Sequence, residues 1–117
     1  MTTLLHDEQC LFCKIAKKEI PSTIVFENEK VLAFKDIAPV APIHLLFIHK
    51  NHTSHVSDLV ENDPCQLSDI FLAIKEYTQK NKIADEGFRV LTNTGVNGGQ
   101  TVFHTHFHLL GGKKLPM

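Results

Sequence analysis

Three histidines stand at alternate positions near the end of the chain, in the stretch VFHTHFHLLGG at 102–112. They are His104, His106 and His108. Side chains of a β-strand alternate between the two faces of its sheet, so a strand here would bring the three imidazoles together on one face. The apolar residues expected to hold the opposite face in the core are Phe107 and Leu109. Such a strand would place the imidazoles on rigid backbone, as a precise site requires.

Three adjacent imidazoles could bind a metal ion, carry out nucleophilic and acid–base chemistry, or have a purely structural role. A catalytic metal site usually recruits carboxylates as well, and no Asp or Glu follows Glu86. Nucleophilic and acid–base chemistry instead needs one neutral imidazole to attack while its neighbours donate hydrogen bonds. A single surface histidine would favour a purely structural interpretation. Three on one face, beside a glycine-rich loop, favour a chemical site.

The loop NTGVNGGQT, at 93–101, runs directly into the histidine strand. Gly98 and Gly99 allow backbone N–H groups to approach an anion closely, and Gln100 and Thr101 add side-chain donors. A glycine-rich loop alone usually indicates a turn. Next to three histidines, the loop indicates a phosphate-binding site.

Length and composition predict a single domain over 1–117, because 117 residues with 43% hydrophobic content suit one core. The sequence has no apolar run of membrane-spanning length and no secretory signal at its start, so a cytoplasmic location is expected. Its 12 Lys and Arg nearly balance its 13 Asp and Glu. Neither nucleic acid nor a membrane surface is therefore expected as a partner.

The elements that must position the histidines can be predicted from periodicity and from turn residues. Alternating apolar residues indicate strands, and Asn62 followed by Pro64 indicates the start of a long amphipathic helix. In order, we expect a short helix within 7–22 that Pro21 ends, a hairpin within 22–37, a strand at 44–50, a helix at about 63–81, and strands beginning at 87 and 101. This order predicts an α+β fold, with an antiparallel sheet of about five strands and two helices packed on it.

The stretch HTHFHLL matches the pattern His-x-His-x-His-x-x with apolar x that defines the histidine triad (HIT) family. Together with AFKDIAPVAPIHLL and NGGQTVFH, it resembles the Hint-type branch of nucleotide phosphoramidases over nearly the whole chain. The resemblance implies a HIT-like fold, a homodimer and a purine nucleotide substrate. It also implies hydrolysis of purine nucleoside monophosphate derivatives, at P–N or related bonds, through a nucleotidyl-histidine intermediate.

The resemblance assigns roles to the reacting groups. The middle histidine of the triad, His106, would be the nucleophile, and we expect a backbone carbonyl of its own strand to hold its other nitrogen. His108 would contact the phosphate, and His44 would lie beside the triad. Thr101 stands where the branch often has Ser, near the phosphate and the leaving group.

The resemblance also implies a nucleoside pocket. Asp36 matches the acid that binds the ribose hydroxyls, and Asn93 matches an asparagine near the phosphate and ribose. The residues expected around the base are Phe12, Ile15, Phe34, Ile37 and Leu46, with Gly99 and Gln100 in the phosphate loop. From sequence alone, the apolar residues also fit an ordinary core, and Asp36 also fits a turn before Pro39.

Cys10 and Cys13 form a C-x-x-C pair, which fits a redox pair, half of a zinc site or two reduced thiols packed near the surface. The resemblance to bacterial members of the branch implies a Cys2His2 ligand set, in which His52 and His104 would join the two cysteines in a structural zinc site. The first triad histidine would then be a ligand rather than a reactant. The other histidines, His6, His49 and His55, are expected to be exposed, without an assigned role.

Two other functions remain open at this point. One is a nucleotide-binding regulatory protein with little turnover, because Hint-type proteins often have partner roles. The other is a zinc-dependent metallohydrolase that uses the His-x-His pair.

Overall fold

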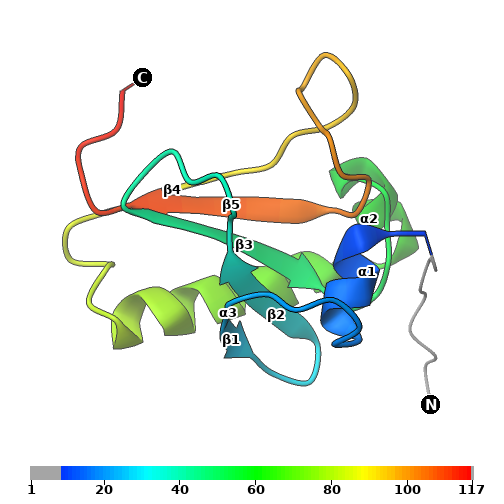
Figure 1. Cartoon of the computed structure of the whole chain (residues 1–117), viewed down its shortest axis with the longest axis horizontal. Coiled ribbons are helices and arrows are strands. Elements are labelled where there is room, and N and C mark those ends of the chain that lie inside the picture. Colours follow the sequence, from blue (N-terminus) through cyan, green and yellow to red (C-terminus); the bar gives the residue numbers. More distant parts are fainter. Residues whose placement is uncertain (1–8, 117) are drawn as a thin grey trace.

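The computed structural model describes residues 9–116 as a five-stranded sheet with helices on both faces (Figure 1). The elements are α1 (Leu11–Ala16), β1 (Ile24–Glu27), β2 (Val31–Lys35), β3 (Ile43–His49), α2 (Val56–Asn62), α3 (Cys65–Lys80), β4 (Arg89–Leu91) and β5 (His106–Gly111). The strands lie in the order β1-β2-β3-β5-β4, and every neighbouring pair is antiparallel. The predicted α+β class and five-stranded sheet are confirmed. None of the helices in this part of the chain has the apolar length that a bilayer crossing needs.

Strand alternation divides the core into two clusters. Leu45 and Phe47 of β3 face α3, in a cluster that also holds Ile70. Leu46 and Ile48, the alternate residues of β3, face α1 and pack with Phe12. The sheet is therefore buried on both sides, and Figure 1 shows α1 and α3 on its opposite faces.

The histidine strand begins later than predicted. β5 starts at His106 rather than at 101, because Thr105 donates its N–H to Thr53 O at 2.8 Å, beyond the end of β3. Phe107 and Leu109 lie in the cluster on the α3 side, as predicted. His106 and His108 pair with Ile48 and Leu46, so these two imidazoles face α1. His104 precedes the strand.

The first helix is shorter than predicted. α1 ends at Ala16, well before Pro21, and the chain turns away at Lys18, which has a left-handed φ of 66°. The part of the predicted helix before residue 9 lies outside the described residues. Cys10 caps the helix, because its Sγ accepts a hydrogen bond from the N–H of Cys13 at 3.3 Å.

The long helix forms almost where expected, but its start differs in detail. The N–H of Cys65 donates to the carboxylate of Asp63 at 3.0 Å, so Asp63 rather than Asn62 satisfies the first turn. The seven-residue helix α2 was not predicted, so three helices rather than two accompany the sheet within residues 9–116. Its N-cap is His55, whose Nδ1 accepts from the N–H of Asp58 at 3.3 Å.

Candidate active site and metal cluster

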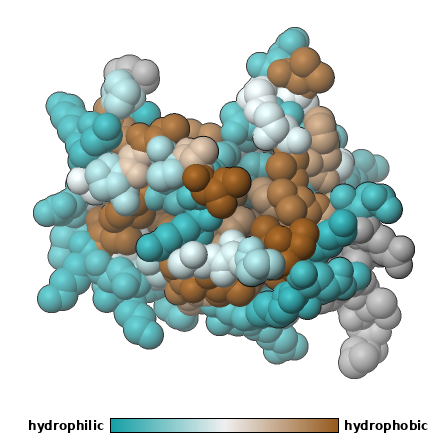
Figure 2. All heavy atoms as spheres, in the orientation of Figure 1, coloured by the Kyte–Doolittle hydropathy of each residue, from teal (hydrophilic) through white to brown (hydrophobic). Residues whose placement is uncertain are grey.

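A cleft of about 970 Å³ opens on the α1 side of the sheet. Figure 2 views the molecule as in Figure 1 and shows hydrophobic surface in the middle of this face, with polar side chains around it. The predicted site residues that line the cleft are Phe12, Ile15, Phe34, Asp36, Ile37, Leu46, Asn93, Gly99, Thr101, His106 and His108. The fold thus brings together residues from α1, β2, β3, β5 and the glycine-rich loop.

The cleft also includes residues that the sequence analysis missed. Most of them belong to the segment 20–23, which leads from α1 into β1, and the others flank predicted positions. They are Leu11, Ile20, Pro21, Ser22, Thr23, Lys35 and Val102. No motif marks this segment, and only the pairing of β1 with β2 brings it beside Phe34.

His106 has one ring nitrogen held and the other left for chemistry. Its Nδ1 lies 2.7 Å from the carbonyl oxygen of His104, so this nitrogen carries the proton and donates it. This is the backbone contact that the sequence analysis expected. Burial lowers the pKa of His106 below the usual imidazole value, although the contact with the carbonyl opposes the shift. The ring is therefore a neutral imidazole with an unprotonated Nε2.

His108 is the end of a hydrogen-bond chain that begins at the backbone. The N–H of Val40 donates to His44 Nδ1 at 3.1 Å, so His44 carries its proton on Nε2. That Nε2 lies 2.9 Å from His108 Nδ1 and donates to it, which leaves His108 with its own proton on Nε2. Burial, followed by the neighbouring His106 and His44, lowers the pKa of His108 to about 4. His108 is thus a neutral hydrogen-bond donor.

Asp36 lies beside this chain, with Oδ2 3.4 Å from His44 Nε2. Asp36, His44 and His108 are close enough together to suggest a metal site. Val40 argues against this, because its N–H occupies Nδ1 of His44 and keeps the proton on Nε2, which a metal would need free. Asp36 Oδ1 also accepts from the N–H of Ala38 at 2.8 Å, so Asp36 stabilises a turn and lines the cleft as well.

Gln100 does not have the predicted role. Its Oε1 accepts from the N–H of Gly95 at 2.9 Å, and its Nε2 donates to Ser54 O at 2.6 Å and Val102 O at 3.1 Å. The side chain is buried and braces the loop from inside, so its prediction as a phosphate donor is wrong. The sequence did not distinguish these two roles, because a glutamine beside glycines can donate to a phosphate or hydrogen-bond within its own loop equally well.

The glycines of the loop also act differently from the prediction. The N–H of Gly99 donates to Val96 O at 3.0 Å and is not open to an anion. At Gly98, a Cβ would lie 2.3 Å from Thr94 O, so the tight turn itself requires glycine there. Asn93 closes the turn by donating from Nδ2 to Gly98 O at 2.7 Å. The loop is therefore a self-bonded structure, and its Thr101 hydroxyl lies at the cleft.

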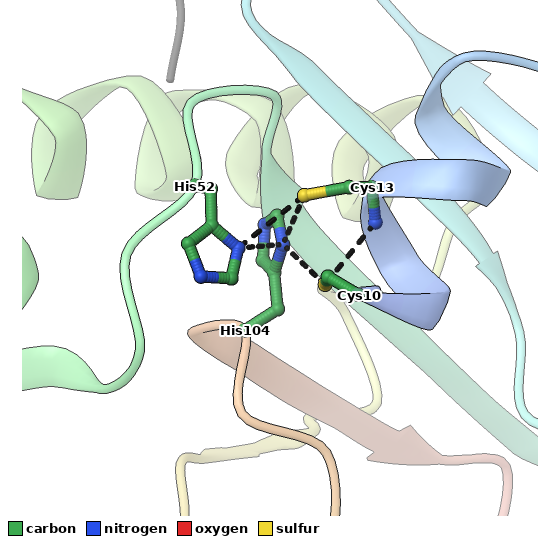
Figure 3. Close-up of side chains that lie close together, drawn as sticks. All are labelled: Cys10, Cys13, His52 and His104. Atoms are coloured by element: carbon green, nitrogen blue, oxygen red, sulfur yellow. Dashed lines mark hydrogen bonds between the residues drawn. The ribbon is translucent and has the colours of Figure 1, made fainter. Parts of the chain in front are cut away.

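The four predicted zinc ligands converge at one point (Figure 3). Cys10 and Cys13 come from the start of α1, His52 follows β3, and His104 precedes β5. Nδ1 of His104 lies 3.4 Å from each sulfur and 3.3 Å from Nδ1 of His52. Nδ1 of His52 lies 3.3 Å from the Cys13 sulfur.

These donor atoms suit a tetrahedral zinc ion. Zinc–sulfur bonds of about 2.3 Å and zinc–nitrogen bonds of about 2.0 Å place two nitrogen ligands roughly 3.3 Å apart, a nitrogen and a sulfur about 3.5 Å apart, and two sulfurs about 3.8 Å apart. His104 also donates from Nε2 to His49 O at 2.9 Å, which leaves the Nδ1 lone pair directed at the cluster. Burial lowers the pKa of His104 to about 4, so its ring is neutral as ligation requires. The Cys and His residues therefore form a cluster that could hold a metal ion.

His49 and His55 are not the exposed residues that the sequence analysis expected. His49 is buried in β3, where its Nδ1 accepts from the N–H of Asn51 at 3.1 Å and its Nε2 donates to Asp69 Oδ2 at 3.0 Å. His55 caps α2 and is partly buried. The alternation of β3 could have placed His49 on the α3 side. His6 lies outside the described residues.

Comparisons with known proteins agree with this arrangement. A purine nucleoside phosphoramidase of Escherichia coli K12 is 39% identical over 108 residues, covering 92% of this chain and 91% of its own. A 14 kDa zinc-binding protein of Zea mays is 42% identical over 112 residues, covering 95% of this chain and 88% of its own. A histidine triad protein of Clostridium difficile superposes with a TM-score of 0.93 at 43% identity, covering 97% of this chain and 98% of its own.

A HIT family hydrolase of Clostridium thermocellum superposes with a TM-score of 0.90 at 47% identity, covering 96% of this chain and 97% of its own. The family model that describes the HIT domain matches residues 17–115. The match includes the cleft-lining residues of the sheet and the loop, and it covers well over half of the chain. The chain therefore belongs to the HIT family, which includes hydrolases.

Proposed function

We propose that this chain hydrolyses purine nucleoside phosphoramidates, releasing an amine and a nucleoside monophosphate. The observation that carries the proposal is His106, which lines the cleft with Nδ1 fixed by the His104 carbonyl and Nε2 left for attack. The similarity to a purine nucleoside phosphoramidase supports the same substrate class. The predicted single domain over 1–117 would carry the whole site.

The reaction would proceed in two displacements at the α-phosphorus. Nε2 of His106 attacks the phosphorus, the P–N bond breaks, and the leaving nitrogen takes a proton from solvent and departs as an amine. Water then attacks the same phosphorus and gives up a proton to solvent, and the bond to His106 breaks, so that His106 leaves as a neutral imidazole. Nδ1 of His106 keeps its proton throughout, and the His104 carbonyl stabilises the positive charge that the ring gains in the intermediate.

The phosphate oxygens would be bound by neighbouring donors. His108 presents Nε2–H because His44 donates to its other nitrogen. This donor is fixed before substrate arrives, so little reorganisation accompanies the development of charge on the oxygens. The hydroxyl of Thr101 lines the same cleft and would lie near the phosphate and the leaving group.

The decisive test of this function is the covalent intermediate. Protein mixed with an adenosine phosphoramidate and quenched in alkaline denaturant should carry one added adenylyl group on His106, located by peptide mass spectrometry. Alkaline quenching is needed because the P–N bond of such an adduct is acid-labile. Turnover without an adduct would favour the metallohydrolase, in which water attacks directly. Binding of adenosine monophosphate without turnover would favour the regulatory protein.

The ribose contact can be tested at Asp36, which we expect to accept hydrogen bonds from the vicinal hydroxyls. Asp36→Asn should lower kcat/KM for an adenosine phosphoramidate by about tenfold to 100-fold, because each charge-assisted hydrogen bond contributes roughly 1.5–3 kcal/mol. The 2′-deoxy substrate should lose much less on the same substitution. Steady-state kinetics with both substrates measure the difference. An equal loss for the two substrates would contradict the ribose contact.

The pH dependence of turnover should reflect the lowered pKa values of the cleft. The pKa of His108 is lowered to about 4, from the 6.5 of an ordinary imidazole, so His108 stays neutral as the pH falls through 6.5. The pKa of His106 is lowered as well, and attack needs its neutral form. We expect kcat/KM, corrected for uncatalysed hydrolysis, to stay nearly constant from about pH 8 to about pH 5.5. A fall centred near pH 6.5 would contradict this expectation.

We also propose that the Cys and His cluster holds a structural zinc ion. The donor set, the distances and the similarity to a zinc-binding plant protein support this. Bound zinc would act as a cross-link between α1 and the segments that carry His52 and His104. The residues of the cluster would not take part in bond making or breaking.

A homodimer is proposed from the family resemblance, and the outer face of α3 agrees with it. Phe71 and Leu72 are neighbouring exposed apolar side chains on this helix, at 46% and 64% exposure. Exposed apolar area of this kind is often covered in an oligomer. Light scattering should give twice the chain mass of 13.2 kDa, and Leu72→Glu should shift the mass toward the monomer. The chain mass alone for the parent would contradict the dimer.

A further inference from the structure

We propose that the metal cluster positions the nucleophile, so that the loss of metal or of one ligand lowers turnover without preventing folding or nucleotide binding. The positioning residue is His104. Its ring belongs to the cluster, and its backbone carbonyl holds Nδ1 of His106 at 2.7 Å. The inference rests on the proposed role of His106 as the nucleophile.

The ring of His104 is fixed at both nitrogens. Nδ1 lies 3.3–3.4 Å from three other ligand atoms of the cluster, and Nε2 donates to His49 O at 2.9 Å. The residue is fully buried. The side chain of His49, at the end of β3, donates to Asp69 of α3. The contact of His104 Nε2 with His49 O is therefore anchored in the core. Of the two contacts that fix the His104 ring, loss of the metal would therefore remove the one at Nδ1 and leave the one at Nε2.

The backbone of His104 has less support than its ring. β5 begins at His106, and the last pair of its ladder with β3 joins His106 to Ile48. His104 lies before that pair, in a segment without regular secondary structure. The His104 carbonyl shares a planar peptide with the N–H of Thr105, which donates to Thr53 O at 2.8 Å, so this bond holds the carbonyl from one side and the anchored ring of His104 holds it from the other. A shift of the ring would therefore move the carbonyl that orients the nucleophile.

The nucleoside end of the cleft has separate support. Phe12 and Ile15 pack with Leu32 and Phe34 in an apolar cluster that also contains Cys10 and Cys13, so apolar contacts hold α1 on the sheet in addition to any bound metal. Asp36 is fixed by the turn in which it accepts from Ala38. Loss of the metal should thus affect the approach of His106 to phosphorus much more than the affinity for the nucleoside. Misplacement of a reacting group by about 1 Å can lower a rate by about 100-fold.

The most suitable variant is His52→Ala. His52 is only partly buried, and its ring contacts Cys13 and His104 of the cluster, so its removal spares the two buried thiols and the core. The matched control is Cys65→Ser, which changes an exposed cysteine on α3, outside the cluster. Chelator-treated parent protein provides a second route to the same state without any substitution.

Three measurements test the inference on four samples: zinc-loaded parent, chelator-treated parent, His52→Ala and the Cys65→Ser control. In the chelator-treated parent and in His52→Ala, we expect kcat to fall about tenfold to 100-fold, while the Kd for adenosine monophosphate changes less than about threefold. Nitrogen NMR of the histidine rings should show the His106 Nδ1–H signal displaced or broadened in these two samples only. Melting curves should show that all four samples are folded at the assay temperature.

Unchanged His106 ring signals in folded, metal-free protein would overturn the inference, as would an unchanged kcat. The NMR arm requires no turnover. A zinc-loaded parent that shows no activity would therefore count against the proposed function, while its ring signals would still decide whether the cluster positions His106.

Discussion

His106→Ala is expected to abolish turnover of an adenosine phosphoramidate, by at least about 1000-fold in kcat, while nucleotide binding survives. The expectation follows from the two nitrogens of the ring. Nδ1 is occupied by the His104 carbonyl at 2.7 Å, so Nε2 is the only ring nitrogen left to attack phosphorus. Neither neighbour can replace it, because His44 donates into Nδ1 of His108 and both rings are fixed in that chain.

His106→Asn provides a more stringent version of this experiment. An asparagine amide can still donate to the His104 carbonyl, but it has no nitrogen at the position of Nε2. This variant should lose turnover as completely as the alanine variant. It should be less destabilised, because Phe12 packs on the ring of His106 with centroids 5.0 Å apart, and asparagine fills more of that space than alanine does. His55→Ala, outside the cleft, is the histidine control and should keep parental activity. Substantial turnover by His106→Asn would place the nucleophile elsewhere.

Much of the fold could be predicted because strand alternation has a short period and a clear cause. Leu45 and Phe47 alternate with Leu46 and Ile48, and each pair enters a different core cluster. The start of β5 could not be predicted in this way, because the alternating pattern continues back to 101 while the ladder stops at His106. What stops it is the contact of Thr105 with Thr53, which joins residues 52 positions apart.

The missed helix α2 has a similar explanation. Its seven residues give too few turns for helical periodicity to appear, and its cap is a histidine, which is not among the preferred capping residues. Its only local signal is Asp58 in the first turn, which accepts from the N–H of Ser54 at 2.8 Å.

In the candidate site, residue types were predicted better than hydrogen-bond partners. Eleven of the residues expected from the family resemblance line the cleft. Six of them come from α1 and the strands, whose faces periodicity and alternation define, and the other five lie in loops. Gln100 was placed wrongly because its partner Ser54 lies 46 positions away. His49 was overlooked for the same reason, since Asp69 lies on another element. Long-range polar contacts leave no local pattern in the sequence.

The second large effect is expected at the two cysteines, as a loss of stability. Cys10→Ser combined with Cys13→Ser should remove the bound metal and lower Tm by at least about 10 °C. A metal present at a thousand times its Kd stabilises the folded state by about 4 kcal/mol, and serine hydroxyls do not replace thiolate ligands. The six-residue helix α1 has little helical stability of its own, so it depends on its apolar contacts and on this cluster.

Calorimetry and metal analysis of the same samples test this expectation. The parent should contain about one zinc per chain, and chelation should lower its Tm nearly to that of the double variant, since both states then lack the cross-link between α1, His52 and His104. Cys65→Ser should melt like the parent, because this cysteine is exposed and lies outside the cluster. If the parent carries no metal and its Tm changes with neither chelator nor added zinc, the two thiols contribute to stability only by packing. The double variant would then differ from the parent by no more than the small change expected for two buried sulfur-to-oxygen replacements.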